Sequence, residues 1–89
     1  MKTAIIIPTY KRPAFLERVL TSLSQCVYPS DVEIHVVENG PVSGSEEVCR
    51  THSIGGRVRY LYSPIAGRSK AINYAVECSD ADFFIFFDD

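Results

Sequence analysis

The sequence has no tryptophan and one methionine, and it contains neither of two familiar glycine-rich phosphate-binding motifs. The absence of GxxxxGK followed by Ser or Thr excludes a P-loop protein, and the absence of GxGxxG argues against a nicotinamide dinucleotide site. The run Gly67-Arg68-Ser69-Lys70 has similar residue types without the P-loop spacing. Phosphate binding, if present, must use other groups.

Basic residues are also few, and they are scattered along the chain. Nine Lys and Arg residues stand against eleven Asp and Glu residues, which gives a net charge of -2. A nucleic-acid-binding surface needs clustered Lys and Arg and a basic balance. A nucleic-acid partner is therefore not expected.

Long apolar runs and paired cysteines are missing as well. No stretch approaches the roughly 20 apolar residues that cross a membrane, and the run 4–7 is too short for a signal-peptide core. Cys26, Cys49 and Cys78 are odd in number, far apart and without a CxxC pair, so we interpret them as reduced helix residues. These absences predict a cytoplasmic protein without a membrane-spanning segment.

What the chain does contain is enough apolar material for one core. It has 89 residues, of which 46% are hydrophobic. No repeat, low-complexity tract or internal boundary interrupts it, so we expect a single domain, residues 1–89. A domain this short buries a smaller fraction of its surface than a large one, which makes support from a partner subunit plausible.

Apolar segments with strand character alternate with helical patterns. Residues 13–26 repeat apolar side chains with helical spacing, and Pro13 suits a first helical turn. Residues 83–87 (FFIFF) are apolar at every position, as in a strand covered on both faces. The predicted strands are 3–8, 32–38, 58–62 and 83–87; the predicted helices are 13–26, a short one from Ser45 toward Gly55-Gly56, and 67–78.

The order β-α-β-α-β-α-β predicts an α/β fold with a mostly parallel, Rossmann-like sheet. Because crossovers between parallel strands are right-handed, we expect the strand order 3-2-1-4. The winding direction reverses between the first and fourth strands. Ligands bind outside the carboxyl ends of the strands at such a reversal.

Chemically useful side chains follow the strands at that edge. Two adjacent carboxylates after the fourth strand suit Mg²⁺ or Mn²⁺, which usually bridges to substrate phosphates. An aromatic ring after the first strand offers a flat face for a base, and a carboxylate ending the second can accept hydrogen bonds from a base or ribose. The residues are Pro8, Thr9 and Tyr10; Glu38; and Asp88 with Asp89.

Positive groups near the same edge complete a nucleoside diphosphate site. Arg12, Arg68 and the amino end of the third predicted helix are placed to neutralise a diphosphate. Other interpretations stay open: the Asp88-Asp89 pair also fits a solvated strand end, and Tyr10 also fits a packed aromatic. A receiver-like signalling domain needs its acid pair after the first strand, where Tyr10 and its neighbours stand instead.

Taken together, these segments resemble the amino-terminal, nucleotide-binding half of family-2 inverting GT-A glycosyltransferases, over essentially the whole chain. The resemblance implies binding of a nucleoside-diphosphate sugar, most often UDP-linked, together with a divalent metal. The segments that carry it are IIIPTYKRPAFLERVLTSLSQ, VEIHVVENG, GRSKAINYAVE and FFIFFDD.

The resemblance also implies roles for single residues. Pro8, Thr9 and Tyr10 match the loop that holds the base and ribose. Glu38 matches a position where the family usually has an Asp that contacts uracil. Gly67 and Arg68 match the helix start near the base and phosphates, Asn73 matches an Asn in that helix, and Asp88-Asp89 matches the opening of the DxD motif, whose acids bind ribose and metal.

The sequence departs from the family in length. Members are more than twice as long, and their second half carries the acceptor site, the rest of the DxD motif and the base that deprotonates the acceptor. We therefore expect a truncated, remnant or fragmentary glycosyltransferase that binds the nucleotide without efficient transfer on its own. The alternative is a non-catalytic regulatory or protein-interaction module that keeps the fold without the site.

The apolar strand 83–87 has a consequence for assembly. An apolar strand at a sheet edge is an aggregation hazard, and the predicted helices cover it only in part. We expect a homodimer that buries this strand or the surface near it.

Overall fold

The structure is a computed structural model, and it describes residues 1–65 and 67–87. Four strands alternate with three helices, in the predicted order. The elements are β1 (Thr3–Thr9), α1 (Pro13–Leu23), β2 (Val32–Glu38), α2 (Ser45–Thr51), β3 (Val58–Tyr62), α3 (Arg68–Glu77) and β4 (Phe83–Phe86).

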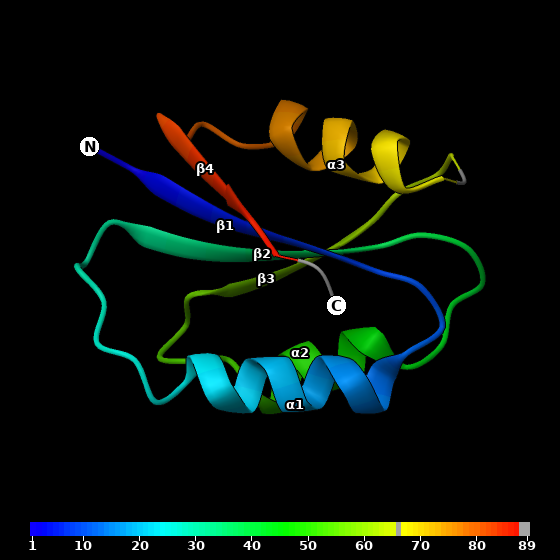
Figure 1. Cartoon of the computed structure of the whole chain (residues 1–89), viewed down its shortest axis with the longest axis horizontal. Helices are drawn as coiled ribbons and strands as arrows, with labels where there is room; N and C mark the ends of the chain where they lie inside the picture. The colour runs from blue at the N-terminus through cyan, green and yellow to red at the C-terminus, as the bar shows by residue number, and fades with distance from the viewer. Residues whose placement is uncertain (66, 88–89) are drawn as a thin grey trace.

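The strands form one parallel sheet in the order β3-β2-β1-β4, which confirms the predicted topology. The chain winds outward from β1 through β2 to β3, and then crosses back to place β4 on the other side of β1. In Figure 1, α1 and α2 lie on one face of the sheet and α3 lies on the other. This is the three-layer arrangement that buries a parallel sheet on both faces.

Alternation along β1 divides the core into two layers, because successive strand residues point to opposite faces. Ile5 and Ile7 pack toward α1 and α2, whereas Ala4 and Ile6 pack toward α3. The first layer holds Ile5, Ile7, Leu16, Leu20, Leu23, Ile34, Val36 and Cys49. The second layer holds Ala4, Ile6, Val37, Ala71 and Ala75.

Several predicted boundaries differ from the structure: β4 ends at Phe86 rather than Phe87, α3 covers Arg68–Glu77 rather than 67–78, and α2 ends at Thr51, before Gly55-Gly56. Two further differences, in α1 and β1, have identifiable reasons. Helix α1 ends at Leu23 rather than Cys26, since the next amides bond three residues back, Gln25 N–H to Ser22 O and Cys26 N–H to Leu23 O. Strand β1 continues through Pro8 to Thr9. Pairing with β4 reaches only Ile6↔Phe86, so the N–H that Pro8 lacks is not needed by that neighbour.

Strand β4 lies at the edge of the sheet and is only partly covered. Phe83, Ile85 and Phe86 are 54%, 47% and 51% exposed, while Phe84 packs against the α3 layer. The interpretation of this apolar run as a strand covered on both faces is therefore wrong, whereas the expected partial cover by the helices is found. The homodimer that would bury this strand stays a prediction.

Within residues 1–65 and 67–87, no helix has the length and apolar character needed to span a membrane. The three cysteines are free. Cys49 is buried in α2, and Cys26 and Cys78 are exposed just beyond the ends of α1 and α3.

Truncation of Leu20 tests the first core layer. Leu20 is fully buried, so Leu20→Ala removes apolar burial and leaves a cavity. We expect the free energy of unfolding to fall by about 2–5 kcal/mol, measured by urea unfolding. The matched control, Val27→Ala, removes a side chain that is 98% exposed and should change it by no more than about 0.5 kcal/mol. Equal effects of the two variants would contradict this packing.

Candidate functional site

The ends of three strands meet at one edge of the sheet, on the right in Figure 1. Thr9 at the end of β1 is in register with Glu38 at the end of β2, which is in register with Tyr62 at the end of β3. Backbone bonds tie the loops beyond: Asn39 N–H donates to Thr9 O at 3.0 Å, and Ser63 N–H donates to Glu38 O at 2.8 Å. The carboxyl ends of these three strands therefore lie side by side, as predicted, and backbone hydrogen bonds join them.

Tyr10 is the exposed aromatic of this edge, with 49% of its surface open to solvent. Its ring stands against Gly40, so closely that a Cβ at Gly40 would lie 2.3 Å from Tyr10 Cε1. Gly40 also has a positive φ of 81°, which a residue with a side chain adopts only with strain. Only glycine therefore fits here without moving the ring. Lys11 Nζ lies 5.2 Å from the ring centroid.

The other two residues of the predicted first loop belong to β1. Pro8 and Thr9 are both buried, so their side chains are less available than that of Tyr10. The Oγ1 atom of Thr9 is buried and has no hydrogen-bond partner in the structure. A buried hydroxyl without a partner is costly unless something supplies one. The nucleotide-binding roles of Pro8 and Thr9 stay predictions.

Glu38 points inward, because it shares the strand face of the core residues Ile34 and Val36. Its side chain is fully buried. One oxygen accepts a hydrogen bond from Tyr60 OH at 2.5 Å. The other accepts bonds from Ser43 N–H at 3.1 Å and from Ser43 Oγ at 2.6 Å. In this geometry Glu38 supports the 39–44 loop, and a direct contact with a base stays a prediction that requires the loop to release the carboxylate.

Burial sets the protonation of the groups around Glu38. Burial, followed by the hydrogen bond to Glu38, raises the pKa of the Tyr60 phenol, so Tyr60 remains a hydrogen-bond donor at neutral pH. Burial, with the charges of Glu38 and Glu46 nearby, raises the pKa of the Cys49 thiol to about 12. Cys49 is therefore an inert core thiol.

The predicted cationic groups lie at helix starts. Arg12 precedes α1, is exposed, and places its guanidinium 5.1 Å from the centre of the Phe15 ring. Gly67 is the residue before α3, with a φ of 116°, and Arg68 is the first residue of that helix. Both are exposed. Asn73 lies further along α3 and borders a hollow of about 210 Å³ with residues 63–65 that follow β3.

The predicted metal ligands, Asp88 and Asp89, lie outside the described residues. The described chain reaches Phe87, whose N–H donates to Ile6 O at 2.9 Å beside β1. Within residues 1–65 and 67–87 no cluster of three His, Cys, Asp or Glu side chains is placed to hold a metal ion.

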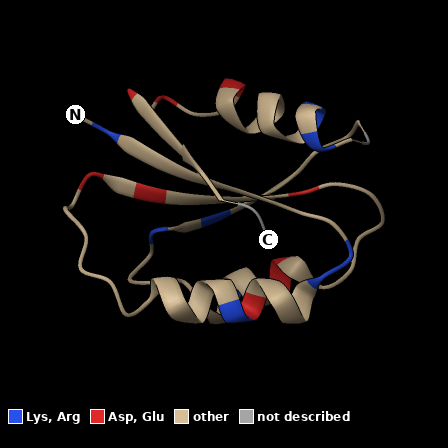
Figure 2. Cartoon of the chain, viewed as in Figure 1, with Lys and Arg blue, Asp and Glu red and all other residues tan. Residues whose placement is uncertain are grey.

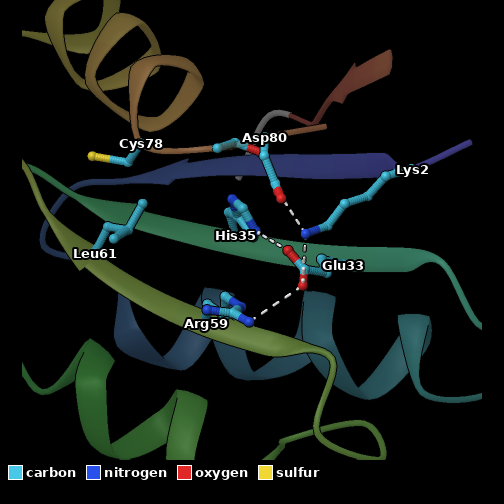
Figure 3. A pocket seen from close by; sticks show the side chains of 8 residues that line it. Lys2, Glu33, His35, Arg59, Leu61, Cys78 and Asp80 are labelled. Atoms are coloured by element: carbon cyan, nitrogen blue, oxygen red, sulfur yellow. Dashed lines mark hydrogen bonds and ion pairs between the residues drawn. The ribbon is translucent and has the colours of Figure 1, made fainter. Parts of the chain in front are cut away.

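A second hollow, of about 430 Å³, lies on the α3 side of β2 and β3, toward the strand starts (Figure 3). Glu33 stands at its centre. One oxygen lies 2.9 Å from His35 Nε2, and the other lies 3.3 Å from both Lys2 Nζ and Arg59 Nη2. Lys2 also contacts Asp80 at 2.6 Å. Figure 2 shows charged residues of both signs at this end.

This ion-pair network was not predicted from the sequence. A signal was available in the alternation of β2, where Glu33 and His35 interrupt one face while Ile34 and Val36 fill the other. Glu33 on β2 pairs with Lys2, which precedes β1, and with Arg59 on β3. The side chain of His35 is buried, with 4% of its surface exposed. The arrangement fits a structural network of ion pairs on the α3 side of the sheet.

The fold and the loop edge define a class: a parallel α/β unit with the topology of a mononucleotide-binding half. The sequence profile of the family described as "Glycosyl transferase family 2" matches residues 4–89. The chain belongs to that family. This confirms the resemblance stated from the motifs.

Among curated relatives, the chain is similar to validoxylamine A glucosyltransferase of Streptomyces hygroscopicus subsp. limoneus. The two are 30% identical over 88 residues, which cover 96% of this chain and 19% of that protein. The chain thus spans about a fifth of the length of this relative.

Two solved structures share the fold. One is S. aureus TarS 1-349, with a TM-score of 0.85 and 22% identity over 99% of this chain and 27% of that chain. The other is the mannosyltransferase PcManGT from Pyrobaculum calidifontis, with a TM-score of 0.84 and 20% identity over 98% of this chain and 27% of that one. TarS 1-349 has been solved with UDP, and PcManGT with GDP-Man and Mn²⁺.

The Glu33 network predicts a pH-dependent contribution to stability. The hydrogen bond with His35, with help from Lys2 and Arg59, lowers the pKa of Glu33 below its ordinary value of 4.5. Its stabilisation is therefore complete above that value and is lost as the pH falls through the lower pKa of the folded state. We expect Glu33→Gln to reduce the free energy of unfolding at pH 7 by about 1 kcal/mol. On acidification, the free energy of unfolding of this variant should decrease less than that of the wild type.

Urea unfolding between pH 7 and pH 3 measures both effects. The matched control is Glu77→Gln, which neutralises an exposed carboxylate on α3. A Glu33→Gln profile parallel to that of the wild type would show that the network adds nothing to acid stability.

Proposed function

We propose that this chain binds the nucleoside diphosphate part of a nucleotide sugar, UDP by preference, with a divalent metal, at the carboxyl edge of its sheet. The observation that carries the proposal is the meeting of the β1, β2 and β3 ends around the exposed Tyr10 ring. Membership of the glycosyltransferase family, and relatives solved with UDP or GDP-Man, support the same assignment.

The base and the phosphates take different parts of the edge. Tyr10 offers a half-exposed ring against which a base can stack, next to the buried Pro8 and Thr9. The amino end of α3 at Gly67 and Arg68 directs backbone N–H groups and a positive dipole end outward, which favours a diphosphate. Arg12 is a further positive charge at the start of α1.

In this proposal the metal ion binds to the carboxylates of Asp88 and Asp89. Asp88 and Asp89 are hard oxygen donors, and Mn²⁺ or Mg²⁺ accepts such ligands while bridging to phosphates. A bound metal would supply positive charge to the diphosphate. Their place in the sequence, directly after Phe87 beside β1, fits that use.

The proposal concerns binding by these 89 residues. Transfer of a sugar also requires an acceptor site and a base, which the family resemblance assigns to a following half. A cytoplasmic location and a homodimer remain predictions. The alternative function, an interaction module without a nucleotide site, is an outcome of the test below.

Titration with UDP, with and without Mn²⁺, tests the proposal. A ligand that binds only the folded state at 100 times its Kd adds about 2.7 kcal/mol of stability. For a domain of this size we expect the melting temperature to rise by roughly 10 °C or more, and the midpoint of the UDP titration to fall when Mn²⁺ is present. No response to UDP, GDP or dTDP at millimolar concentration favours the interaction module.

Two variants separate the base from the metal. Tyr10→Ala removes the stacking surface and should weaken UDP binding about 10- to 100-fold, whether or not Mn²⁺ is present. Its control, Tyr10→Phe, keeps the ring and should keep the affinity. Asp89→Asn should abolish the effect of Mn²⁺ and leave metal-free binding intact. Loss of Mn²⁺ dependence in Tyr10→Ala, or its retention in Asp89→Asn, contradicts the assigned roles.

A further inference from the structure

Two tyrosines of β3 hold the segment that follows β2. Tyr60 and Tyr62 lie two residues apart on the strand, and both phenols reach toward the neighbouring strand end. Tyr60 OH donates to Glu38 Oε1 at 2.5 Å, and Tyr62 OH donates to Gly40 O at 2.6 Å. Each bond spans 22 positions of sequence; the first ties β3 to the end of β2, and the second ties β3 to the 39–44 loop.

The loop is anchored from its other end by Ser43. The backbone N–H and the hydroxyl of Ser43 both donate to Glu38 Oε2. Residues 39–42 are therefore held between Glu38 and Ser43, and Gly40 lies in the middle with its carbonyl bound to Tyr62. This leaves Gly40 little freedom of position.

Gly40 in turn determines where Tyr10 stands. The Gly40 backbone is so close to the Tyr10 ring that a Cβ added to Gly40 would lie 2.3 Å from one ring carbon and 2.6 Å from the next. A shift of the Gly40 backbone toward the ring therefore moves the ring. Contacts run without a gap from the Tyr62 hydroxyl through Gly40 to Tyr10.

We propose that Tyr62 is a positioning residue for the nucleotide base: its hydroxyl fixes Gly40, and Gly40 fixes the Tyr10 ring on which the base stacks. This role rests on the proposed nucleotide-binding function and adds to it a residue that none of the matched motifs contains. Tyr62 is 42% exposed, so its hydroxyl contributes little to the core. Its effect is to order the binding surface before the ligand arrives, which lowers the entropy lost on binding.

The substitution Tyr62→Phe removes the hydroxyl and keeps the ring. A net hydrogen bond of this kind corresponds to about a three- to tenfold change in an equilibrium constant. We expect the Kd for UDP and the Kd for UMP to rise by the same factor in this range. The Kd for inorganic pyrophosphate, which lacks a base, should not change, and the melting temperature of the free protein should fall by no more than about 8 °C.

Tyr28→Phe is the matched control. Tyr28 OH also donates to a backbone carbonyl, Leu23 O, at 2.6 Å, but in the turn after α1. It should leave all three dissociation constants unchanged. In ¹H–¹⁵N spectra of the free protein, Tyr62→Phe should shift the amide signals of Gly40 and Tyr10, and Tyr28→Phe should not.

The outcomes distinguish the inference from the function on which it rests. If the wild type binds none of the nucleotides, the proposed function fails, and the positioning role falls with it. If the wild type binds UDP and Tyr62→Phe binds it equally well, the positioning role alone is wrong. Equal losses of UDP and pyrophosphate binding would also overturn it, since they indicate a general structural effect.

Discussion

Parallel pairing of the central strand β1 with both β2 and β4 is the constraint on which the rest of the structure depends. It aligns Thr3 with Val32 on one side and with Phe83 on the other, so these three strands start together. Helices then return each chain segment from the carboxyl edge to the opposite edge. The loops that follow β1, β2 and β3 therefore lie at one edge, together with the Tyr10 ring and the start of α3.

A hydrogen-bond network around the buried Glu38 side chain supports that edge from inside the protein. The buried Glu38 side chain joins β2, β3 and the 39–44 loop through Tyr60 and Ser43, and both of its oxygens accept hydrogen bonds from the chain itself. A buried carboxylate without such donors would be strongly destabilising. The opposite end of the sheet has its own ion-pair network around Glu33. The two networks use charge for structure, while the exposed edge is available for a ligand.

Much of this was predictable from sequence. The bounds of β2 and β3 were predicted to the residue because turn residues flank short β-rich runs, and strand order followed from the handedness of crossovers. The inward direction of Glu38 also follows from its parity with Ile34 and Val36, whereas its contact with a nucleotide stays a prediction. Its partner Tyr60 was not predictable, since that bond depends on the register of strands distant in sequence. The Gly40–Tyr10 contact is likewise set only by tertiary packing.

Chemical-shift mapping of UDP on the ¹⁵N-labelled chain tests whether the nucleotide lies at the carboxyl edge of the sheet. We expect the amide signals of Tyr10, Gly40 and Arg68 to shift on addition of UDP, while those of Glu33, His35 and Arg59 stay in place. The reverse pattern, with shifts around the Glu33 hollow and none at the carboxyl edge, would contradict this location.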